Sequence, residues 1–275
     1  MLIAVDTGGT KTLVASFGKD GVLGKQIKFP TPKDPKEYIK ELRSVLKENY
    51  DGKPVEAIVV ATPGIIKKGI LVWGGGNLTT WKNINISSEL VGVLGKAPVF
   101  HENDANLAGL GETRFLNTTP PQSLYVTIST GIGDGIITDG HINKSLSNSE
   151  SGHAMIEYDG VVREWETFAS GKAIYKAYGK YAHDITSKTI WNQIADRISR
   201  GFLAVIPILQ PDVIIIGGSI GTYFEKYGHQ LQAILNEKLP SHIPCPKFVQ
   251  AKYPELAVIY GCYYYAVDAF ASKTA

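Results

Sequence analysis

One short pattern that occurs twice limits the fold of this chain more than any other feature. An apolar run, a glycine-rich turn beginning with Thr-Gly and a second apolar run occupy Ala4–Ala15 and return at Thr127–Thr138. Thr7 of the first copy corresponds to Thr130 of the second, an offset of 123 residues. Few identical residues accompany the match. Two copies of one strand–turn–strand unit nevertheless predict two similar lobes with a cleft between them.

The rest of the chain alternates between strand-like and helix-like segments. Asp34 is a good helix N-cap and Pro35 suits the first helical position, so a helix is expected to follow. Pro207 is expected to kink or end the long helix in which it stands. The expected strands are Leu2–Val5, Thr12–Phe17, Ala57–Ala61, Pro98–His101, Leu124–Ser129, Gly135–Thr138 and Val213–Ile216, and the expected helices cover about 35–50, 105–114, 187–206, 221–238 and 255–271. This alternation predicts an α/β fold.

Composition excludes several classes of protein. The chain has 275 residues, 44% of them apolar and 20% charged, which is a globular balance and allows about two lobes. The 28 basic and 26 acidic residues nearly cancel and form no Lys/Arg-rich block, so we expect no nucleic-acid partner other than a nucleotide, and no membrane partner. No apolar run approaches the ~18 residues that span a bilayer. Cys245 and Cys262 cannot form a disulfide framework, and we expect a cytoplasmic protein.

The first glycine turn, Asp6-Thr7-Gly8-Gly9-Thr10-Lys11, has the chemistry of a phosphate site. Its glycines let the backbone approach a ligand closely, and Thr10 and Lys11 add donors. Asp6, at a strand end, is a candidate for holding Mg²⁺ through water. A polar hairpin turn without a ligand remains an alternative for this segment alone. The turn is not a P-loop, because no Gly-Lys-Ser/Thr follows at the required spacing.

Two further glycine-rich segments lie in the second half. Thr130-Gly131-Ile132-Gly133-Asp134-Gly135 could hold another phosphate on its backbone N–H groups and on the Thr130 hydroxyl. Gly217 and Gly218 follow a β-branched strand and precede a helix, so a flat ring could lie on bare backbone there. Each segment taken alone is also consistent with a structural turn.

The motifs occur in a fixed order along nearly the whole chain. They are Asp6-Thr7-Gly8-Gly9-Thr10-Lys11, Thr62-Pro63-Gly64, Asn77-Leu78-Thr79-Thr80-Trp81, Glu102-Asn103-Asp104-Ala105-Asn106, Thr130-Gly131-Ile132-Gly133, Glu150-Ser151-Gly152-His153, Glu166-Thr167-Phe168-Ala169-Ser170-Gly171 and Gly217-Gly218. This ordered set resembles the ROK family (repressors, open reading frames, sugar kinases) of the actin/hexokinase/Hsp70 superfamily. The resemblance implies a two-lobed actin-like ATPase (ribonuclease H-like) fold with an interlobe cleft. It further implies lobes at 1–112 and 113–256, a helix at 257–275 that packs back on the first lobe, and a homodimer.

The resemblance also implies an activity and the residues that perform it. Asp104 matches the family's catalytic carboxylate, which accepts a proton from a sugar hydroxyl as that oxygen attacks ATP; an isolated Asn-Asp before a helix is otherwise an N-cap. ATP and Mg²⁺ are the implied cofactors, and glucose is the expected sugar. Substrate binding is implied for Asn77, Asn103, Asp104, Glu150, His153 and Glu166, and nucleotide binding for Asp6, Gly8, Gly9, Thr10, Lys11, Thr130, Gly131, Gly133, Gly217 and Gly218.

The chain departs from the family pattern in two places. Members often carry three cysteines after the Gly-His, which bind structural zinc together with that histidine. This chain has Glu157, Asp159 and Glu164 at those positions, and Arg163 replaces a glycine. A structural zinc site without thiolates is unusual, so we expect no zinc and carboxylates on a solvated face. Ser129 and Asp134 each replace a glycine in the second phosphate turn, and the charge of Asp134 would repel ATP unless its side chain points away or helps to hold Mg²⁺.

Alternative functions remain open. The acceptor could be N-acetylglucosamine, N-acetylmannosamine, mannose or fructose, since one hydroxyl contact can change specificity. The phosphoryl donor could be polyphosphate. A sugar sensor or transcriptional repressor is also considered, although the phosphate turn begins at Asp6 and leaves no room before it for a DNA-binding helix-turn-helix.

Overall fold

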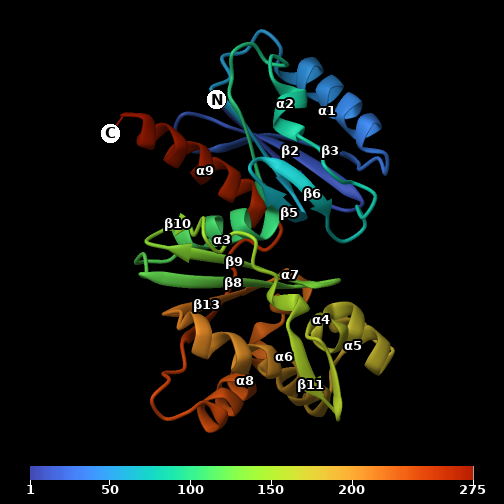
Figure 1. The fold of residues 1–275 in the computed structure, drawn as a ribbon, viewed down its shortest axis with the longest axis vertical. Helices are drawn as coiled ribbons and strands as arrows, with labels where there is room; N and C mark the ends of the chain where they lie inside the picture. The colour runs from blue at the N-terminus through green and yellow to red at the C-terminus, as the bar shows by residue number, and fades with distance from the viewer. Residues whose placement is uncertain (275) are drawn as a thin grey trace. The chain divides into compact units, whose positions relative to one another are not determined.

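The computed structural model describes residues 1–274 and divides the chain into two compact α/β units (Figure 1). The first unit comprises Met1–Gly111 and Leu256–Ala275, and the second comprises Glu112–Glu255. The sequence predicts lobes at 1–112 and 113–256 and a returning helix at 257–275, and these boundaries stay a prediction. The last of these residues, Ala275, lies outside the described part of the chain. Among the helices described, none combines the length and the apolar character needed to cross a membrane.

The first unit is built on a five-stranded sheet of order β3-β2-β1-β4-β7. Strands β1, β4 and β7 are parallel, whereas β2 and β3 run antiparallel to their neighbours. The strands of the unit are β1 (Leu2–Thr7), β2 (Lys11–Phe17), β3 (Leu23–Pro30), β4 (Ala57–Thr62), β7 (Val99–Asn103) and the small hairpin β5 (Gly64–Lys67) with β6 (Ile70–Gly74). Its helices are α1 (Pro35–Tyr50), α2 (Ile86–Leu90), α9 (Ala257–Thr274) and the start of α3 (Asp104–Arg114).

Alternation along the strands gives this sheet two apolar faces. Ile3 and Val5 of β1 belong to the buried cluster that includes the apolar side of α1. On the other face, Phe17 packs against Tyr263 of α9 with ring centroids 4.9 Å apart. Helix α9 also meets α3 closely, because a side chain at Gly261 would overlap the carbonyl of Leu107. Helix α1 therefore packs on one face of the sheet and helix α9 on the other. Because the helices cover the faces, a site can form at the ends of the strands.

The second unit repeats this arrangement in a sheet of order β10-β9-β8-β13-β14. Again three strands, β8, β13 and β14, are parallel, and two are antiparallel. Its strands are β8 (Gln122–Ile128), β9 (Ile132–Thr138), β10 (His141–Ile142), β13 (Val213–Gly217), β14 (Lys247–Gln250) and the hairpin β11 (Met155–Tyr158) with β12 (Val161–Glu164). Its helices are η1 (Ser151–His153), α4 (Glu166–Ala169), α5 (Gly171–Tyr178), η2 (Ala182–Asp184), α6 (Lys188–Leu209), α7 (Gly218–Gly221) and α8 (Phe224–Lys238).

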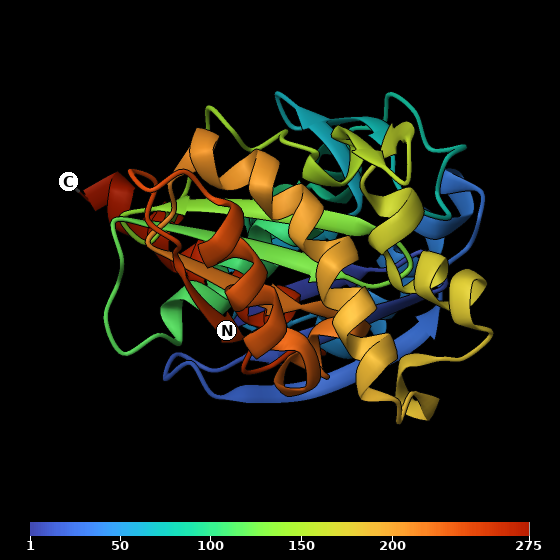
Figure 2. The ribbon, with the colours of Figure 1, turned by 90° about the horizontal axis from the view of Figure 1, so that it is seen from below.

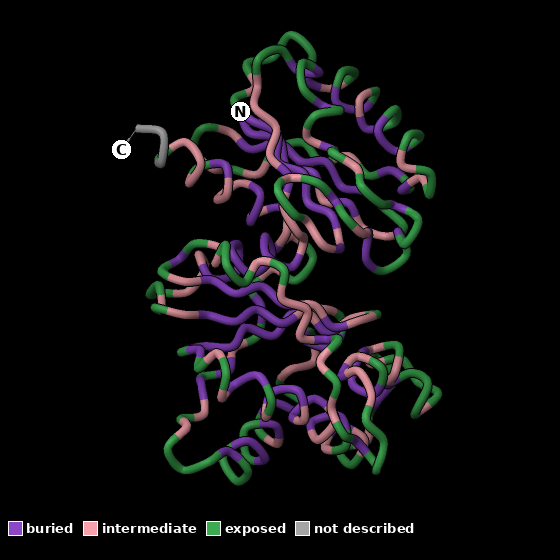
Figure 3. The backbone as a smooth tube through the Cα atoms, in the orientation of Figure 1, coloured by how far each residue is buried: buried purple, intermediate pink, exposed green. Residues whose placement is uncertain are grey.

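The duplication explains the repeated sequence unit. Hairpins β1–β2 and β8–β9 occupy equivalent places in the two sheets, each joined by a glycine turn. The central strands of each sheet are buried (Figure 3), and α6 and α8 pack side by side over the second sheet (Figure 2). The α/β class predicted from the sequence is confirmed.

Three details differ from the sequence-based expectations. Helix α6 continues past Pro207 and ends at Leu209, two residues after the proline, whose ring nitrogen has no N–H to donate. The N–H of Gln210, in the left-handed conformation, then closes the helix on Ile206 at 2.8 Å. The helix expected at 221–238 is divided into α7 and α8. Seven strands were not expected from the sequence, and all lie at a sheet edge or in a two-stranded hairpin: β3, β5, β6, β10, β11, β12 and β14.

Candidate functional site

Two acidic side chains meet at one edge of the first sheet. Asp6 stands near the end of β1, and Asp104 follows β7 directly as the first residue of α3. Both strands are parallel to β4, so their carboxyl ends share an edge. Burial and the charge of Asp104 raise the pKa of Asp6 to about 7. Burial also raises the pKa of Asp104 to about 6, although the N–H of Ala105 donates to its Oδ1 at 2.9 Å and favours the charged form.

Asn103 supplies the cap of α3. Its Oδ1 accepts hydrogen bonds from the backbone N–H groups of Ala105 (2.8 Å) and Asn106 (3.1 Å), and its amide donates to the carbonyl of Gly64 at 2.9 Å. The capping role considered for the Asn-Asp pair therefore falls on Asn103. After these bonds, one amide hydrogen of Asn103 can still be donated to a ligand. An unbonded asparagine side chain would offer a ligand more hydrogen bonds.

The first glycine turn contacts the loop that carries Asn77. A Cβ at Gly9 would lie 3.0 Å from the Cβ of Asn77, so glycine allows the two segments to touch. The ammonium of Lys33 donates to the carbonyl of Gly9 at 2.6 Å and lies 3.5 Å from that of Asn77. Thr10, Lys11 and Asn77 are exposed. The structure thus joins a predicted phosphate turn to a predicted sugar residue through Lys33, which the sequence analysis missed because no motif marks it.

In the second unit, the other glycine turn contacts Glu166. The Oε2 atom of Glu166 accepts a hydrogen bond from the N–H of Ile132 at 3.1 Å. A Cβ at Gly131 would lie 2.6 Å from the same oxygen. Gly133 pairs with Thr127 inside the β8–β9 ladder, so it belongs to the strand and not to the tip of the turn. Again a predicted phosphate turn and a predicted sugar residue touch.

A cavity of about 870 Å³ lies within the second unit beside this turn. Its volume is in the range of nucleotide and drug-sized ligands. Thr130 and Gly218 line it, whereas Gly217 lies against Tyr125. The other lining residues are Ser129, Gly171, Lys172, Tyr175, Tyr181, Ala182, His183, Ser219, Ile220, Thr222, Tyr223, Pro254 and Glu255. Lys172 and the aromatic side chains were not identified from the sequence, since they share no spacing that marks a pocket.

Asp134 holds the loop that carries Glu150. Its buried carboxylate accepts hydrogen bonds from the Ser149 hydroxyl (2.5 Å) and the Ser151 N–H (2.6 Å). These bonds flank Glu150 on both sides and lead into η1, which ends at His153. The side chain of Asp134 therefore points toward this loop.

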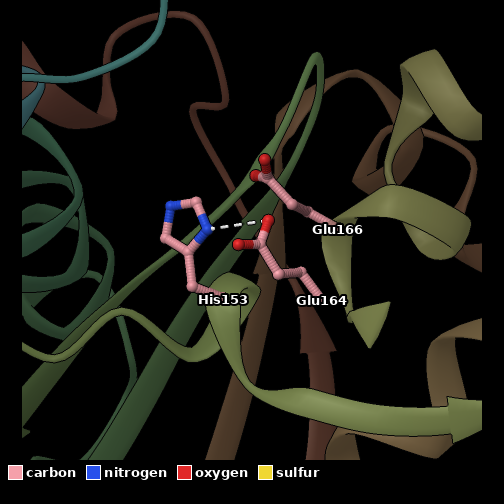
Figure 4. A group of neighbouring side chains, drawn as sticks. All are labelled: His153, Glu164 and Glu166. Atoms are coloured by element: carbon pink, nitrogen blue, oxygen red, sulfur yellow. Dashed lines mark ion pairs between the residues drawn. The ribbon is translucent and has the colours of Figure 1, made fainter. Parts of the chain in front are cut away.

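His153 lies beside the carboxylates of Glu164 and Glu166 (Figure 4), and the charge of Glu150 also acts on its ring. Its Nδ1 forms an ion pair with Oε2 of Glu164 at 3.3 Å, and ligand atoms of His153, Glu164 and Glu166 lie within 4.8 Å of one another. Burial lowers the pKa of His153, but the hydrogen bond to Glu164 and the charges of Glu166 and Glu150 outweigh it, so the pKa is raised overall. The cluster favours the charged imidazole.

The residues present do not fit the family's structural zinc site. Of the three carboxylates at the cysteine positions, only Glu164 lies beside His153. The Oε1 atom of Glu157 accepts the N–H of Gly160 at 2.5 Å, and Asp159 is exposed at the hairpin turn with φ = 53°. A four-coordinate site with thiolate ligands cannot form from this set. Glu157 and Asp159 lie on a solvated face, whereas Glu164 pairs with the histidine.

Comparison with known proteins relates nearly the whole chain to one protein family. The model of the ROK family matches residues 2–269. The chain is 28% identical to a glucokinase of Thermotoga maritima, over 90% of this chain and 89% of the relative. It is 29% identical to a fructokinase of Lactococcus lactis subsp. cremoris, over 79% and 78% of the two chains.

Solved structures show the same fold. A polyphosphate/ATP-glucomannokinase of Arthrobacter sp. strain KM aligns with a TM-score of 0.73 and 27% identity, over 98% of both chains. A ROK-family glucokinase of Streptomyces griseus, in complex with glucose and AMPPNP, aligns with a TM-score of 0.79 and 20% identity, over 97% of this chain and 99% of that one. The fold is the two-lobed actin-like ATPase fold.

Proposed function

The chain belongs to the ROK family, and we propose that it is a sugar kinase that transfers the γ-phosphoryl group of ATP to a hexose hydroxyl. The observation that carries the proposal is the raised pKa of the Asp104 carboxyl group. A carboxylate with a pKa of about 6 at the first residue of a helix is ionised at neutral pH and still basic enough to accept a hydroxyl proton. Asp104 is proposed as that base.

The donor is proposed to occupy the cavity of the second unit. Thr130 and Gly218 supply a hydroxyl and bare backbone at its wall, and the volume of about 870 Å³ suits a nucleotide. The Gly8–Gly9 turn of the first unit, with exposed Thr10 and Lys11, is proposed to contact the phosphates. The similarity to the polyphosphate/ATP-glucomannokinase makes polyphosphate the alternative donor to test.

A divalent cation fits the acidic pair of the first unit. Asp6 and Asp104 are raised toward neutral pKa values by burial, and Asp6 also by the charge of Asp104, so a cation beside them would offset an unfavourable charge. Bound Mg²⁺ would neutralise charge on the phosphates. We propose that Asp6 holds it through water.

The acceptor is proposed to be glucose, with the 6-hydroxyl as nucleophile. Asn77, Asn103, Glu150, His153 and Glu166 are its proposed ligands, because a hexose presents several hydroxyls that each donate and accept hydrogen bonds. The similarity to a fructokinase favours fructose as the second candidate. Homodimerisation and a cytoplasmic location remain predictions from the sequence.

A coupled assay of ADP release tests the proposal. Glucose, fructose, mannose, N-acetylglucosamine and N-acetylmannosamine are offered with ATP, with and without Mg²⁺, and with polyphosphate as the other donor, sugar phosphate then being measured directly. We expect Mg²⁺-dependent turnover with a hexose and ATP. Asp104→Asn should lose about 10²- to 10⁴-fold in turnover and retain sugar binding.

Asp51→Asn is the control, because Asp51 is an exposed residue that follows α1 in the same unit. Its turnover should equal that of the wild type. Undiminished turnover in Asp104→Asn would show that another group is the base. No turnover of any of the five sugars with either donor would overturn the function itself.

A further inference from the structure

We propose that Glu164 is a positioning residue for sugar binding, which pairs with Nδ1 of His153 and so holds the imidazole with Nε2 directed to a sugar hydroxyl. The inference rests on the proposed function, which gives Glu164 no role. It assigns to an ion pair of this chain the task of orienting a histidine.

The register of a small hairpin fixes the pair. His153 ends η1, and Glu164 ends β12. In the β11–β12 ladder Glu164 lies opposite Met155, two residues after His153. The N–H of Trp165 donates to the carbonyl of Ala154 at 2.9 Å and continues the pairing toward His153. The contact of 3.3 Å between Nδ1 and Oε2 therefore follows from strand pairing and not from a chance meeting of surface side chains.

Ring stacking and a cation–π contact hold this hairpin in place. Tyr158 and Phe168 stack with centroids 4.6 Å apart, and the guanidinium of Arg163 lies 5.6 Å from the centroid of each ring. Trp165, the residue after Glu164, is fully buried against α6, where a side chain at Gly201 would overlap its indole ring. This packing fixes the backbone that carries Glu164. The ion pair between Glu164 and His153 therefore costs less conformational entropy than a pair between two mobile surface residues.

The ion pair between Glu164 and His153 determines which ring nitrogen of the histidine is available to a ligand. A carboxylate at Nδ1 keeps a proton on that nitrogen, and Figure 4 shows the other ring nitrogen directed away from both carboxylates. The charged groups that face the ring are Glu150, Glu164 and Glu166, all acidic. Glu150 and Glu166 can only accept hydrogen bonds when ionised, whereas Nε2 of the charged imidazole donates, so the charged ring supplies the complementary contact to a hydroxyl.

The test measures sugar affinity in four variants of the full-length chain. Glu164→Ala should weaken equilibrium binding of the preferred hexose, and raise its KM, by roughly 3- to 10-fold, as expected for a partly exposed ion pair, with kcat changed less than about 2-fold. In a His153→Ala background the same substitution should have no further effect. Glu164→Gln should move the inflection of sugar KM against pH to lower pH, because the imidazolium loses a stabilising charge.

Glu157→Gln is the matched control, since Glu157 lies on the same hairpin and bonds to Gly160 instead of His153. It should leave both constants unchanged. Unchanged affinity in Glu164→Ala, an equal loss in the His153→Ala background, or stoichiometric zinc whose removal abolishes sugar binding would each overturn the inference. Because the wild type is first shown to phosphorylate a hexose, such a failure is distinct from failure of the proposed function.

Discussion

The carboxylate of Asp134 accepts a 2.5 Å hydrogen bond from the hydroxyl of Ser149, fifteen residues away in the chain. With the second bond, from the N–H of Ser151, it anchors the loop around Glu150 to the strand β9. A glycine at this position could not make either contact. The residue that departs from the family pattern thus has a structural task in this chain.

Asp134→Asn should weaken this anchor, because one amide oxygen replaces two acceptor oxygens. The substitution is expected to lower the free energy of unfolding by about 1–3 kcal/mol, measured by urea denaturation, and to raise the sugar KM more than it lowers kcat. Asp139→Asn is the control: Asp139 is exposed on the same hairpin, and asparagine tolerates its φ of 50°. Equal behaviour of the two variants would contradict the anchoring role.

Stability should fall as the pH rises from about 4 to 7. Asp6 and Asp104 have folded-state pKa values of about 7 and about 6, above the ~3.9 of an unfolded aspartate. The folded state therefore binds more protons in this window, and unfolding becomes easier as those protons leave. Thermal unfolding of the ligand-free protein across this range measures the trend.

The double variant Asp6→Asn, Asp104→Asn should be more stable than the wild type at pH 8 and show a shallower dependence on pH. Turnover should follow the opposite trend, since a base must be ionised: kcat/KM of the wild type is expected to fall as the pH drops through about 6. A double variant that is less stable than the wild type at pH 8 would show that burying these two charged carboxylates does not destabilise the folded state.

Arg163→Ala should loosen the β11–β12 hairpin. The guanidinium lies over Tyr158 and Phe168 and donates to the carbonyl of Tyr158 at 3.2 Å. Its loss should cost roughly 1 kcal/mol of stability and raise the sugar KM.

The thermal unfolding of the wild type should not change when EDTA is added, and metal analysis of the protein should find no zinc.

Lys226→Ala is the comparison for Arg163→Ala, since its ammonium lies 5.2 Å from the ring centroid of Tyr223 on another part of the same unit. A similar loss of stability with an unchanged sugar KM is expected. Should EDTA lower the unfolding temperature of the wild type, a metal and not the arginine would be holding the hairpin.

Gly218→Ala should damage the cavity proposed to bind the nucleotide. Gly218 has φ = 77°, and a Cβ there would lie 2.5 Å from the carbonyl oxygen of Ile128. Gly179 has a similar φ of 63° but open space around it, so Gly179→Ala isolates the backbone cost of about 1–2 kcal/mol. The larger loss of stability and of ATP affinity, by urea denaturation and equilibrium binding, is expected in Gly218→Ala. Comparable losses would show that the overlap is relieved without strain.

Local signals were enough to place the main elements. The helix predicted at about 35–50 occurs at Pro35–Tyr50, with Asp34 accepting the N–H groups of Lys36 and Glu37 as its cap. The apolar strands of both sheet centres are confirmed, since buried parallel strands require continuous apolar residues. Strand β3, half polar and at the edge of its sheet, left no such pattern.

The sequence by itself determined the duplicated α/β architecture, the family and the chemical types present, because glycine turns, strand periodicity and motif order are local properties of a chain. Only the tertiary structure decided which groups touch. It paired Glu164 with His153, aimed Asp134 at Ser149, joined Lys33 to Gly9, and made Asn103 the cap beside Asp104. These contacts, and the carboxylate pKa values that burial shifts, depend on strand register and packing between segments far apart in the chain, and no residue spacing encodes them.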